Sequence, residues 1–354
     1  MLNNSEELIP TISICIPTFN RCEKIFKLVT DILSYPGEEI QVIVLDNCST
    51  DETKMVLNKI TDKRFCFCQN EENIGGVFNI LKTLTLGKGK FSILCLDKDD
   101  LDQSQIDKIA RKFNLDSEVV FGHFTLNIKN ESSDIIYDKG YPSVLKMAYS
   151  TIHPTGIFYK TDEYKKLTIL KDIFDKKKNF PFYTDIINAE MAMMGKSLLI
   201  NSPIFYTEKK EDAREKPSFT YNENNLYFSP LNRRIQFDTY LEYGENLKLS
   251  NYELFKLTIR LYYQGLILST FGYKYMKGDY DVCAHHCIAS DKVSYLDMWK
   301  LSLHFCFHFI KKETAINFLQ KAVIIFIGNF KFAIKIVLMS FKFLKSLICH
   351  NGRK

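Results

Sequence analysis

The sequence lacks the marks of a secreted or membrane-spanning chain. Its ten cysteines show no spacing typical of a disulfide framework, which favours a reducing compartment. Residues 1–7 are polar and acidic, without the basic and apolar regions of a secretory signal. No uncharged apolar run approaches the roughly 20 residues that a spanning helix needs. We therefore expect a cytoplasmic protein that at most lies on the cytoplasmic face of a membrane.

Acidic residues are absent from the last 34 residues, 321–354, which hold seven cationic side chains. The 354 residues together carry 47 Lys and Arg against 42 Asp and Glu, a net charge of +5. Without this tail the body has 40 basic and 42 acidic side chains, a net charge of −2. Because a nucleic-acid-binding domain needs its basic patch on the folded body, we expect no nucleic-acid partner.

Apolar runs alternate with amphipathic segments over the first hundred residues. The predicted strands are residues 11–16, 41–45, 64–68 and 91–96, and the predicted helices are 22–34, 51–60 and 75–86. Strand–helix–strand repetition with short connections predicts a parallel α/β sheet with right-handed crossovers. Ligands bind such sheets beyond the carboxyl ends of the strands.

The rest of the chain divides into a mixed part and a helical part. Between residues 102 and 228 we expect strands at 119–127, 134–137, 157–159 and 197–200, a helix at 185–194 and a charged loop at 208–225. Beyond residue 229 we expect only helices, at 231–245, 251–274, 279–288, 295–310 and 313–349. The expected organisation is an α/β domain over residues 1–228, with halves at about 11–101 and 102–228, and a helical region over 229–354.

Polar clusters follow all four strands of the first half. They are residues 17–21 (PTFNR), 46–49 (DNCS), 70–73 (NEEN) and 97–100 (DKDD). Carboxyl ends of parallel strands share one edge of a sheet, so we expect one cleft. In the last cluster Asp97 and Asp99 face the same way, since side chains alternate along a strand. Two carboxylates suit a hard divalent cation such as Mn²⁺ or Mg²⁺, although a solvated acidic turn is the simpler alternative.

Taken in order, these segments resemble glycosyltransferase family 2. The resemblance rests on residues 16–21 (IPTFNR), 46–53 (DNCSTDET), 73–75 (NIG) and 97–100 (DKDD), and it covers roughly residues 12–221. It implies the GT-A fold and inversion at the anomeric carbon. It also implies a donor-nucleotide site and a metal at Asp97 and Asp99. The implied nucleotide-binding residues are Pro17, Thr18, Phe19, Asn20, Arg21, Asp46, Asn73, Gly75 and Asp97.

The resemblance further implies an acidic base at a helix start, because an inverting transfer must deprotonate the acceptor hydroxyl. Asp185 is the candidate. Family members often carry Glu-Asp there, and Thr184 departs from that pattern. The alternative is that Thr184 or Asp185 only caps the helix.

Two further segments are candidate acceptor or lid elements. His153 and Thr155 precede the expected strand 157–159 and either line an acceptor pocket or form a plain turn. Lys210 and Arg214 belong to the charged loop 208–225, which either closes over the diphosphate or is simply solvated.

The C-terminal region offers weaker signals. Residues 283–287 (CAHHC) lack the paired CxxC of zinc sites, so a packing role is expected. His304 and His308 lack the Glu of HExxH, and we expect them to be packing or membrane-interface residues. On a helix, the lysines at positions 331, 335, 342 and 345 fall within a sector of about 80°. We expect the tail, residues 313–354, to contact an anionic membrane surface. The alternative is a helix packed on the catalytic domain with its lysines in solvent.

These observations predict a metal-dependent inverting glycosyltransferase with a UDP-linked donor and a saccharide acceptor, which the resemblance suggests is lipid-linked, as in bacterial capsule, O-antigen or lipooligosaccharide synthesis. A sugar-phosphate nucleotidyltransferase is one alternative, but residues 17–21 are not the Gly-rich loop that such enzymes carry. A non-catalytic glycan-binding or scaffold protein is the other. The oligomeric state is left open.

Overall fold

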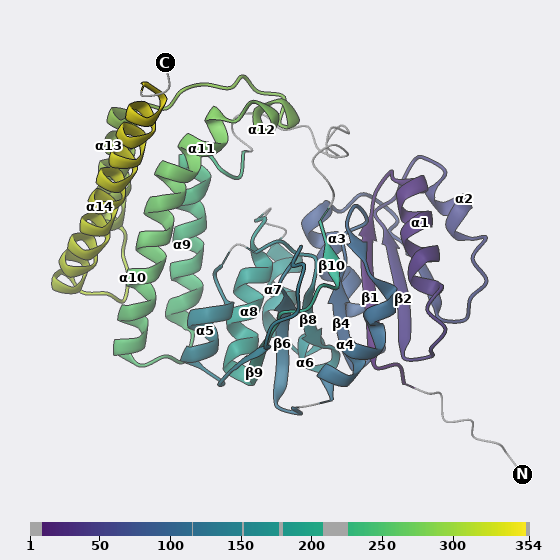
Figure 1. Ribbon diagram of the computed structural model, residues 1–354. Coiled ribbons are helices and arrows are strands. Elements are labelled where there is room, and N and C mark those ends of the chain that lie inside the picture. Colours follow the sequence, from purple (N-terminus) through teal and green to yellow (C-terminus); the bar gives the residue numbers. More distant parts are fainter. Residues whose placement is uncertain (1–8, 115, 151, 177–179, 208–225, 352–354) are drawn as a thin grey trace, which may run out of the picture. The chain divides into compact units, whose positions relative to one another are not determined.

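The computed structural model describes residues 9–114, 116–150, 152–176, 180–207 and 226–351, with side chains as far as residue 339 except at position 176. The chain forms two compact units, Met1–Ser218 and Phe219–Lys354 (Figure 1). We call them the N-terminal unit and the C-terminal unit.

An eight-stranded sheet forms the centre of the N-terminal unit, in the order β3-β2-β1-β4-β8-β6-β9-β7. Its strands are β1 (Ile12–Thr18), β2 (Ile40–Asp46), β3 (Phe65–Gln69), β4 (Phe91–Leu94), β6 (Val119–Phe124), β7 (Ile135–Tyr137), β8 (Ile157–Lys160) and β9 (Lys196–Ile200). The first four strands are mutually parallel, as predicted. Strand β8 runs antiparallel to both β4 and β6, so the complete sheet is mixed.

Helices lie on both faces of this sheet. They are α1 (Cys22–Leu33), α2 (Thr53–Leu57), α3 (Gly76–Thr85), α4 (Ile106–Phe113), α5 (Tyr141–Met147), α6 (Thr161–Lys165), α7 (Thr168–Lys176) and α8 (Tyr183–Met194). The helix predicted over 51–60 is shorter than expected, because Asp51 instead accepts a hydrogen bond from the backbone N–H of Thr53. A 3₁₀ turn, η1 (Gln103–Gln105), precedes α4.

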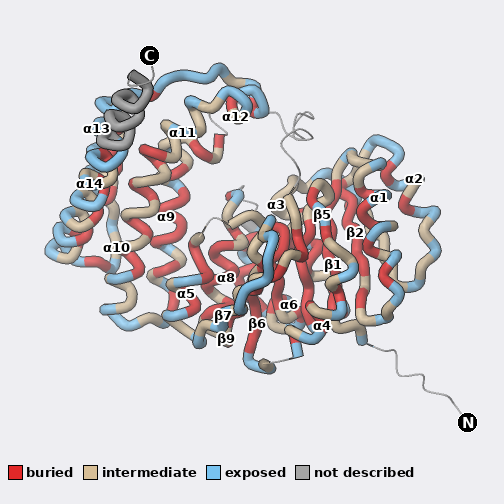
Figure 2. The backbone as a smooth tube through the Cα atoms, in the orientation of Figure 1, coloured by how far each residue is buried: buried red, intermediate tan, exposed pale blue. Residues whose placement is uncertain are grey.

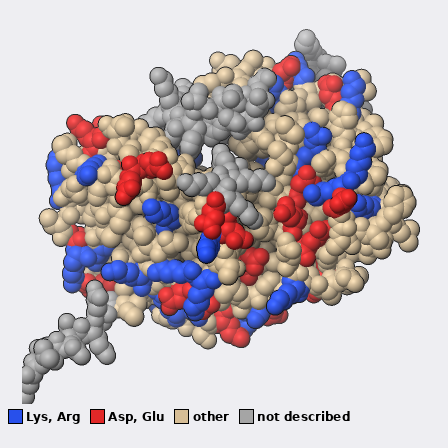
Figure 3. All heavy atoms as spheres, turned by 180° about the vertical axis from the view of Figure 1, so that it is seen from behind, with Lys and Arg blue, Asp and Glu red and all other residues tan. Residues whose placement is uncertain are grey.

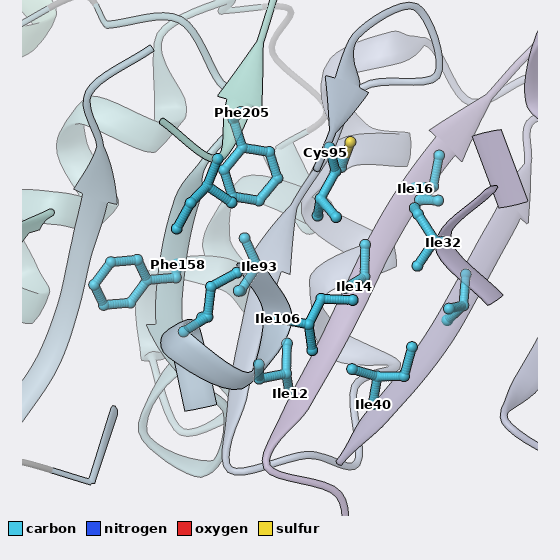
Figure 4. Packing of buried hydrophobic residues seen from close by; sticks show 14 of the residues in the cluster. Ile12, Ile14, Ile16, Ile32, Ile40, Ile93, Cys95, Ile106, Phe158 and Phe205 are labelled. Atoms are coloured by element: carbon cyan, nitrogen blue, oxygen red, sulfur yellow. The ribbon is translucent and has the colours of Figure 1, made fainter. Parts of the chain in front are cut away.

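Alternation along β1 explains why both faces are covered. Ile12, Ile14 and Ile16 are buried in the cluster that also contains apolar residues of α1 and α4 (Figure 4). Cys15 points to the other face and is fully buried as well. A strand buried on both sides reads as a continuous apolar run, which is why this sheet was predictable from the sequence.

A second, two-stranded sheet extends the last polar cluster. Strand β5 (Asp100–Leu101) pairs with β10 (Phe205–Tyr206) in antiparallel fashion. Leu101 and Phe205 are both buried in the core cluster. This pairing anchors the residue that directly follows Asp99.

The C-terminal unit consists of helices in the described residues. They are α9 (Pro230–Asn246), α10 (Asn251–Ile267), the π-helical turn η4 (Leu268–Gly272), α11 (Tyr273–Gly278), α12 (Tyr280–His285), α13 (Tyr295–Lys311) and α14 (Phe318–Asn351). The helix predicted over 251–274 is interrupted at η4, where the hydroxyls of Ser269 and Thr270 donate to the carbonyls of Gly265 and Leu266. Phe237, Tyr262 and Phe305 form the aromatic centre of this unit.

Helix α14 packs with one side and leaves the other exposed (Figure 2). Ile324 and Phe332 are fully buried, whereas Phe326 is 72% and Phe330 59% exposed. Three lysines interrupt the apolar run in sequence, yet by length and composition alone the stretch Phe318–Met339 is sufficient to cross a membrane. Because it contains these lysines, the stretch is not an uncharged run, and the expectation that no uncharged apolar run approaches that length is not contradicted.

Charge is more evenly distributed elsewhere. On the face that Figure 3 shows, basic and acidic side chains of the described residues are intermixed. In α14, Lys321 is 9% exposed, and its ammonium group donates to the backbone carbonyl of Ile310 at 3.5 Å. This lysine therefore contacts the C-terminal end of α13 instead of facing solvent. The basic character of the tail therefore rests on its other cations.

Candidate functional site

The polar clusters after β1, β2, β3 and β4 meet at one edge of the sheet, as predicted. The backbone N–H of Asn20 donates to Ser49 Oγ at 2.8 Å, which joins the first cluster to the second. Asn47 Nδ2 donates to Asn73 Oδ1 at 2.7 Å, which joins the second to the third. Thr18 Oγ1 donates to Asp97 Oδ2 at 2.8 Å, which joins the first to the fourth.

Left-handed backbone shapes this edge. Asn20 has φ 54° and Cys48 has φ 65°, a region that costs a non-glycine residue about 1–2 kcal/mol. Asn20 is held there because its side-chain oxygen accepts from the backbone N–H of Thr50 at 2.8 Å. Such strain persists where the surroundings fix it, and it often marks functional turns.

Asn47 is a site residue that the sequence analysis did not single out. Its side-chain oxygen accepts from Asn70 Nδ2 at 3.1 Å and from the backbone N–H of Ile74 at 3.0 Å. The same Asn47 donates to Asn73, whose oxygen accepts from the backbone N–H of Gly75 at 2.9 Å. Asn47 thus fixes the loop before α3. Its position next to Asp46 in the second motif was the available signal.

Gly75 is required where it stands. Its φ is 86°, and a Cβ added there would meet only Phe78, at 3.9 Å. The space beside this backbone is open, so a ligand can approach it closely.

Asp46 is fully buried, and its carboxylate is already engaged. Its Oδ2 accepts from Gln69 Nε2 at 2.8 Å, and its Oδ1 accepts from the Ser49 hydroxyl. Contact with a nucleoside would require one of these hydrogen bonds to open. The role of Asp46 in nucleotide binding therefore stays a prediction.

Asp97 lies at the centre of the edge, with 12% of its side chain exposed. Burial raises the pKa of this carboxyl. The positive charge of Arg21, the Thr18 hydroxyl and the backbone N–H of Phe19 act in the opposite direction. Arg21 Nε is 3.7 Å from Asp97 Oδ2, which places a cation beside the carboxylate. Pro17 is buried at the end of β1 and positions this segment.

Asp99 is deeper, at 1% exposed. The Thr155 hydroxyl donates to Asp99 Oδ2 and accepts from the backbone N–H of Leu96 at 3.1 Å, so Thr155 connects the carboxylate to the end of β4. His153 Nε2 lies 3.6 Å from the same Asp99 oxygen. Burial lowers the pKa of His153, opposed by the negative charge of Asp99.

These contacts alter the prediction for residues 153 and 155. Thr155 lies in the turn that Pro154 and Ile157 close with a backbone hydrogen bond of 3.1 Å, as the turn alternative expects, and both side chains also lie beside Asp99. Thr155 is 1% exposed, so its side chain positions Asp99 and does not line an open acceptor pocket. His153 is partly exposed, at 32% of its side chain, and faces the same oxygen.

Asp185 lies in the first turn of α8 and is 1% exposed. Phe182, and neither Thr184 nor Asp185, occupies the N-cap position of this helix. The role of Asp185 as the base stays a prediction. The neighbouring backbone is unusual, since the buried Tyr149 has φ 53° and its N–H points to the Asp185 carbonyl at 3.5 Å. The helix dipole favours a negative charge at this position.

Lys210 and Arg214, the candidate lid residues, lie outside the described residues.

Asp97 and Asp99 suit a hard divalent cation by chemistry. Among the residues that the structure describes, no group of three or more His, Cys, Asp and Glu side chains could hold a metal alone. A cation such as Mg²⁺ commonly takes one or two carboxylates and completes its shell with substrate phosphates and water. The two carboxylates after β4 fit that pattern.

The comparisons with known proteins agree with this geometry. The family model for glycosyl transferase family 2 matches residues 13–180. An uncharacterized glycosyltransferase of Haemophilus influenzae is 30% identical over 252 residues, which cover 62% of this chain and 76% of that protein. The Escherichia coli UDP-Glc:alpha-D-GlcNAc-diphosphoundecaprenol beta-1,3-glucosyltransferase WfaP is 34% identical over 89 residues, 25% of this chain and 35% of that protein.

The matches are partial in length. The chain spans between 35% and 44% of the first curated relatives that it matches. Among solved structures, Staphylococcus aureus TarS 1–349 in complex with UDP-GlcNAc superposes with a TM-score of 0.52 at 14% identity, over 83% of this chain and 91% of that one. That likeness supports the GT-A fold. With the Haemophilus relative matched over most of its length and the motifs gathered at one sheet edge, this chain belongs to glycosyltransferase family 2.

Proposed function

We propose that this glycosyltransferase moves a sugar from a UDP-linked donor to a saccharide acceptor carried by a lipid, with a divalent cation and inversion at the anomeric carbon. The observation that carries the proposal is the contact of Asp97 with Thr18 and Arg21 after the carboxyl end of β4, next to Asp99, which the Thr155 hydroxyl contacts. Backbone, carboxylate and guanidinium groups converge there, where a nucleoside diphosphate needs them.

Asp97 and Asp99 would hold the cation, either Mn²⁺ or Mg²⁺. When bound, such an ion supplies positive charge that offsets the charge of a departing diphosphate. Arg21 adds a second cation beside Asp97. Thr155 and Leu96 fix the direction of the Asp99 carboxylate, which limits the reorganisation that binding requires.

Asp185 would accept the proton of the acceptor hydroxyl. Its burial at the start of α8 keeps bulk water from its oxygens, and the helix end favours its ionised form. In that form it attracts the proton of an approaching hydroxyl as the new glycosidic bond develops.

The assignment of donor and acceptor rests on relatives. The Escherichia coli protein is named for UDP-Glc and a diphosphoundecaprenol-linked sugar, and the TarS structure contains UDP-GlcNAc. For this chain we infer a UDP-linked sugar and a lipid-linked acceptor in surface polysaccharide synthesis.

A panel of nucleotide sugars with Mn²⁺, read out as release of nucleoside diphosphate, tests the reaction class. We expect UDP-linked donors to give release that stops on chelation and in Asp99→Asn. A nucleotidyltransferase would instead consume a nucleoside triphosphate and a sugar phosphate and release diphosphate. A scaffold protein would give no turnover with any donor. Either result would refute the proposal.

Membrane contact belongs to the same proposal, and helix α14 supports it. Phe326 and Phe330 stack with ring centroids 6.2 Å apart on its exposed side. Exposed aromatic and aliphatic side chains next to lysines without acidic neighbours suit an anionic leaflet.

Deleting residues 313–354 would also remove the buried Ile324 and Phe332, so point substitutions give the cleaner test. We expect the wild type to sediment with anionic vesicles and Phe326→Ser/Phe330→Ser to stay in the supernatant. A matched control, Phe26→Ser/Tyr252→Ser, changes two exposed aromatic residues elsewhere and should sediment normally. Sedimentation of the first double variant at the wild-type level would overturn the membrane contact.

A further inference from the structure

A cavity of about 860 Å³ is lined by residues of the C-terminal unit, none of which belongs to the strand-end motifs. Its walls come from η4, α11, the segment before α13, and α14. The lining residues are Phe271, Lys274, Tyr275, Gly278, Asp279, Lys292, Val293, Ser294, Lys335 and Met339. The volume falls in the range of small-molecule sites, and none of these residues has a role in the proposed transfer.

The charge of the lining is mostly positive. Lys274, Lys292 and Lys335 bring three ammonium groups, against the single carboxylate of Asp279. That carboxylate is occupied as the N-cap of α12, where it accepts from the backbone N–H of Val282 at 3.1 Å. The cavity is therefore suited to an anion.

Two of the lysines are positioned by neighbouring groups. Lys274 donates to the carbonyl of Val293, and its Nζ lies 5.1 Å from the Tyr295 ring centroid. Lys335 Nζ lies 4.9 Å from the ring centroid of Phe271. Both contacts leave donors for a ligand, since an ammonium group has three. Lys292 is exposed.

The remaining wall is apolar and continues outside the cavity. Phe271 packs on Phe332 at 5.5 Å, and Phe332 packs on Trp299 of α13 at 5.4 Å. Trp299 belongs to a stripe of exposed apolar side chains along α13. Its members are Leu296, Trp299, Leu303, Phe307 and Ile310, each at least 41% exposed. A stripe of this size on a soluble surface marks an interaction site.

We propose that this cavity binds the phosphate of an anionic lipid, with the lipid chain along the apolar wall. The lysines can bind a phosphate group while the aromatic wall contacts the attached lipid chain. A free anion would contact only the lysines, and an uncharged lipid would contact only the apolar wall. A second copy of this chain that presented its own α14 would be a poorer occupant, because α14 has no acidic residue to meet these lysines. The inference extends the proposed membrane contact, on which it rests.

Binding of a soluble short-chain lipid, dihexanoylphosphatidate, to the full-length protein tests the cavity without any membrane. Calorimetry should give measurable affinity for this lipid and weaker affinity for inorganic phosphate. Lys292→Gln/Lys335→Gln should raise Kd roughly twenty- to thirtyfold, because each lysine near an anionic headgroup contributes about a fivefold effect. Lys335→Arg alone should keep most of the affinity, since the charge is retained.

The matched control is Lys248→Gln/Lys256→Gln, which removes the same charge from exposed positions of the same unit. It should bind dihexanoylphosphatidate as the wild type does. Equal losses in both double variants would reduce the effect to net charge and overturn the site. Equal affinity of the wild type for inorganic phosphate and for the lipid would overturn the lipid assignment.

Failure of the cavity is distinguishable from failure of the proposed function. Lys292→Gln/Lys335→Gln should release nucleoside diphosphate from the soluble donor at the wild-type rate, because its changes lie outside the donor site. If that rate falls with the lipid affinity, the double variant disturbs the catalytic unit and the assignment of the cavity as a separate lipid site is wrong.

Discussion

The N-terminal unit buries polar side chains that prefer water, whereas the C-terminal unit exposes apolar side chains that prefer a protein interior. The N-terminal unit buries polar side chains, among them Asn47 and Asp99 after strand ends and Asp185 in the first turn of α8, at 1–2% exposed. The C-terminal unit exposes large apolar side chains, such as Phe326 at 72%. Burying a carboxylate costs free energy unless it is paired, and exposing a phenyl ring costs solubility. The two units therefore differ in which groups they hold against their preferred environment: buried carboxylates in the first and exposed apolar side chains in the second.

The strongest test of this contrast replaces one acid in each unit. Asp185→Asn should lower kcat roughly a thousandfold, because a general base contributes about 10²–10⁴. The KM for the donor should change little, since Asp185 is assigned to the acceptor. Steady-state release of nucleoside diphosphate in the presence of acceptor measures both quantities.

The counterpart in the C-terminal unit is Asp238→Asn. Asp238 receives His308 Nε2 at 2.9 Å and has Lys312 at 3.7 Å, so it serves a structural contact between α9 and α13. This variant should lower stability and leave kcat within about twofold of wild type, as expected of a surface ion pair. If Asp238→Asn lost turnover as Asp185→Asn does, the division of roles between the units would fail.

A second test concerns Thr155, which positions Asp99. Thr155→Val should weaken Mn²⁺ activation about 10–100-fold, the usual effect of removing a partner of a metal ligand. The dependence of initial rate on Mn²⁺ concentration measures it. Thr161→Val removes a buried hydroxyl from the contact with Ser92, 2.9 Å away in the same unit, and should leave that dependence unchanged. If the initial rate depended on Mn²⁺ concentration in the same way in both variants, Thr155 would have only a structural role.

The strand-end cluster was largely predictable from the sequence, because buried parallel strands read as apolar runs and their polar ends share an edge. The contacts that organise it were not. Nothing in the residue pattern indicates that Thr155 reaches back to Asp99, since 56 positions separate them and the connection depends on how β8 joins the sheet. Thr155 reaches Asp99 because β8 runs antiparallel to β4. A short apolar run in the sequence predicts a strand but does not indicate whether the strand is parallel or antiparallel to its neighbours.

The C-terminal region was predicted to be helical, but neither the number of its helices nor their environment was predicted: the single helix expected over 251–274 is divided into α10, η4 and α11. Periodicity located α13 and α14, yet it gave no sign that Lys321 turns inward to the end of α13. A lysine can bury its aliphatic chain while its ammonium group donates to backbone carbonyls, or it can extend into solvent. The sequence alone does not indicate which of these two environments a lysine adopts. The cavity lined by Lys274, Lys292 and Lys335 follows from packing of three separated segments, so it too was invisible.

Packing of α14 offers a third test. A Cβ at Gly328 would lie 2.6 Å from the ring of Tyr262, which is itself enclosed by Phe305 and Phe309. Gly328→Ala should therefore destabilise the C-terminal unit by about 1–2 kcal/mol, overpacking outweighing the gain in helix propensity. Denaturant unfolding measures it.

Gly272→Ala is the control, because a Cβ there meets nothing closer than 3.7 Å. It should stabilise slightly, by up to about 1 kcal/mol. If Gly328→Ala also stabilised, α14 would not be packed on α10, and the exposed face assigned to the membrane would have to be redrawn.

The smallest expected effect concerns backbone strain in the N-terminal unit. Cys48 has φ 65°, and replacing it with glycine removes a cost of about 1 kcal/mol. Cys48→Gly should raise the free energy of unfolding by that amount, whereas Cys22→Gly, in the first turn of α1, should lower it by a similar amount. Because the strained turn holds Ser49 against Asn20, a gain in stability accompanied by a rise in the donor KM would mean that the strain serves binding. A gain in stability with an unchanged donor KM would show that Cys48 does not contribute to donor binding. The proposed donor site at this edge of the sheet would then rest on the contacts of Asp97 and Asp99.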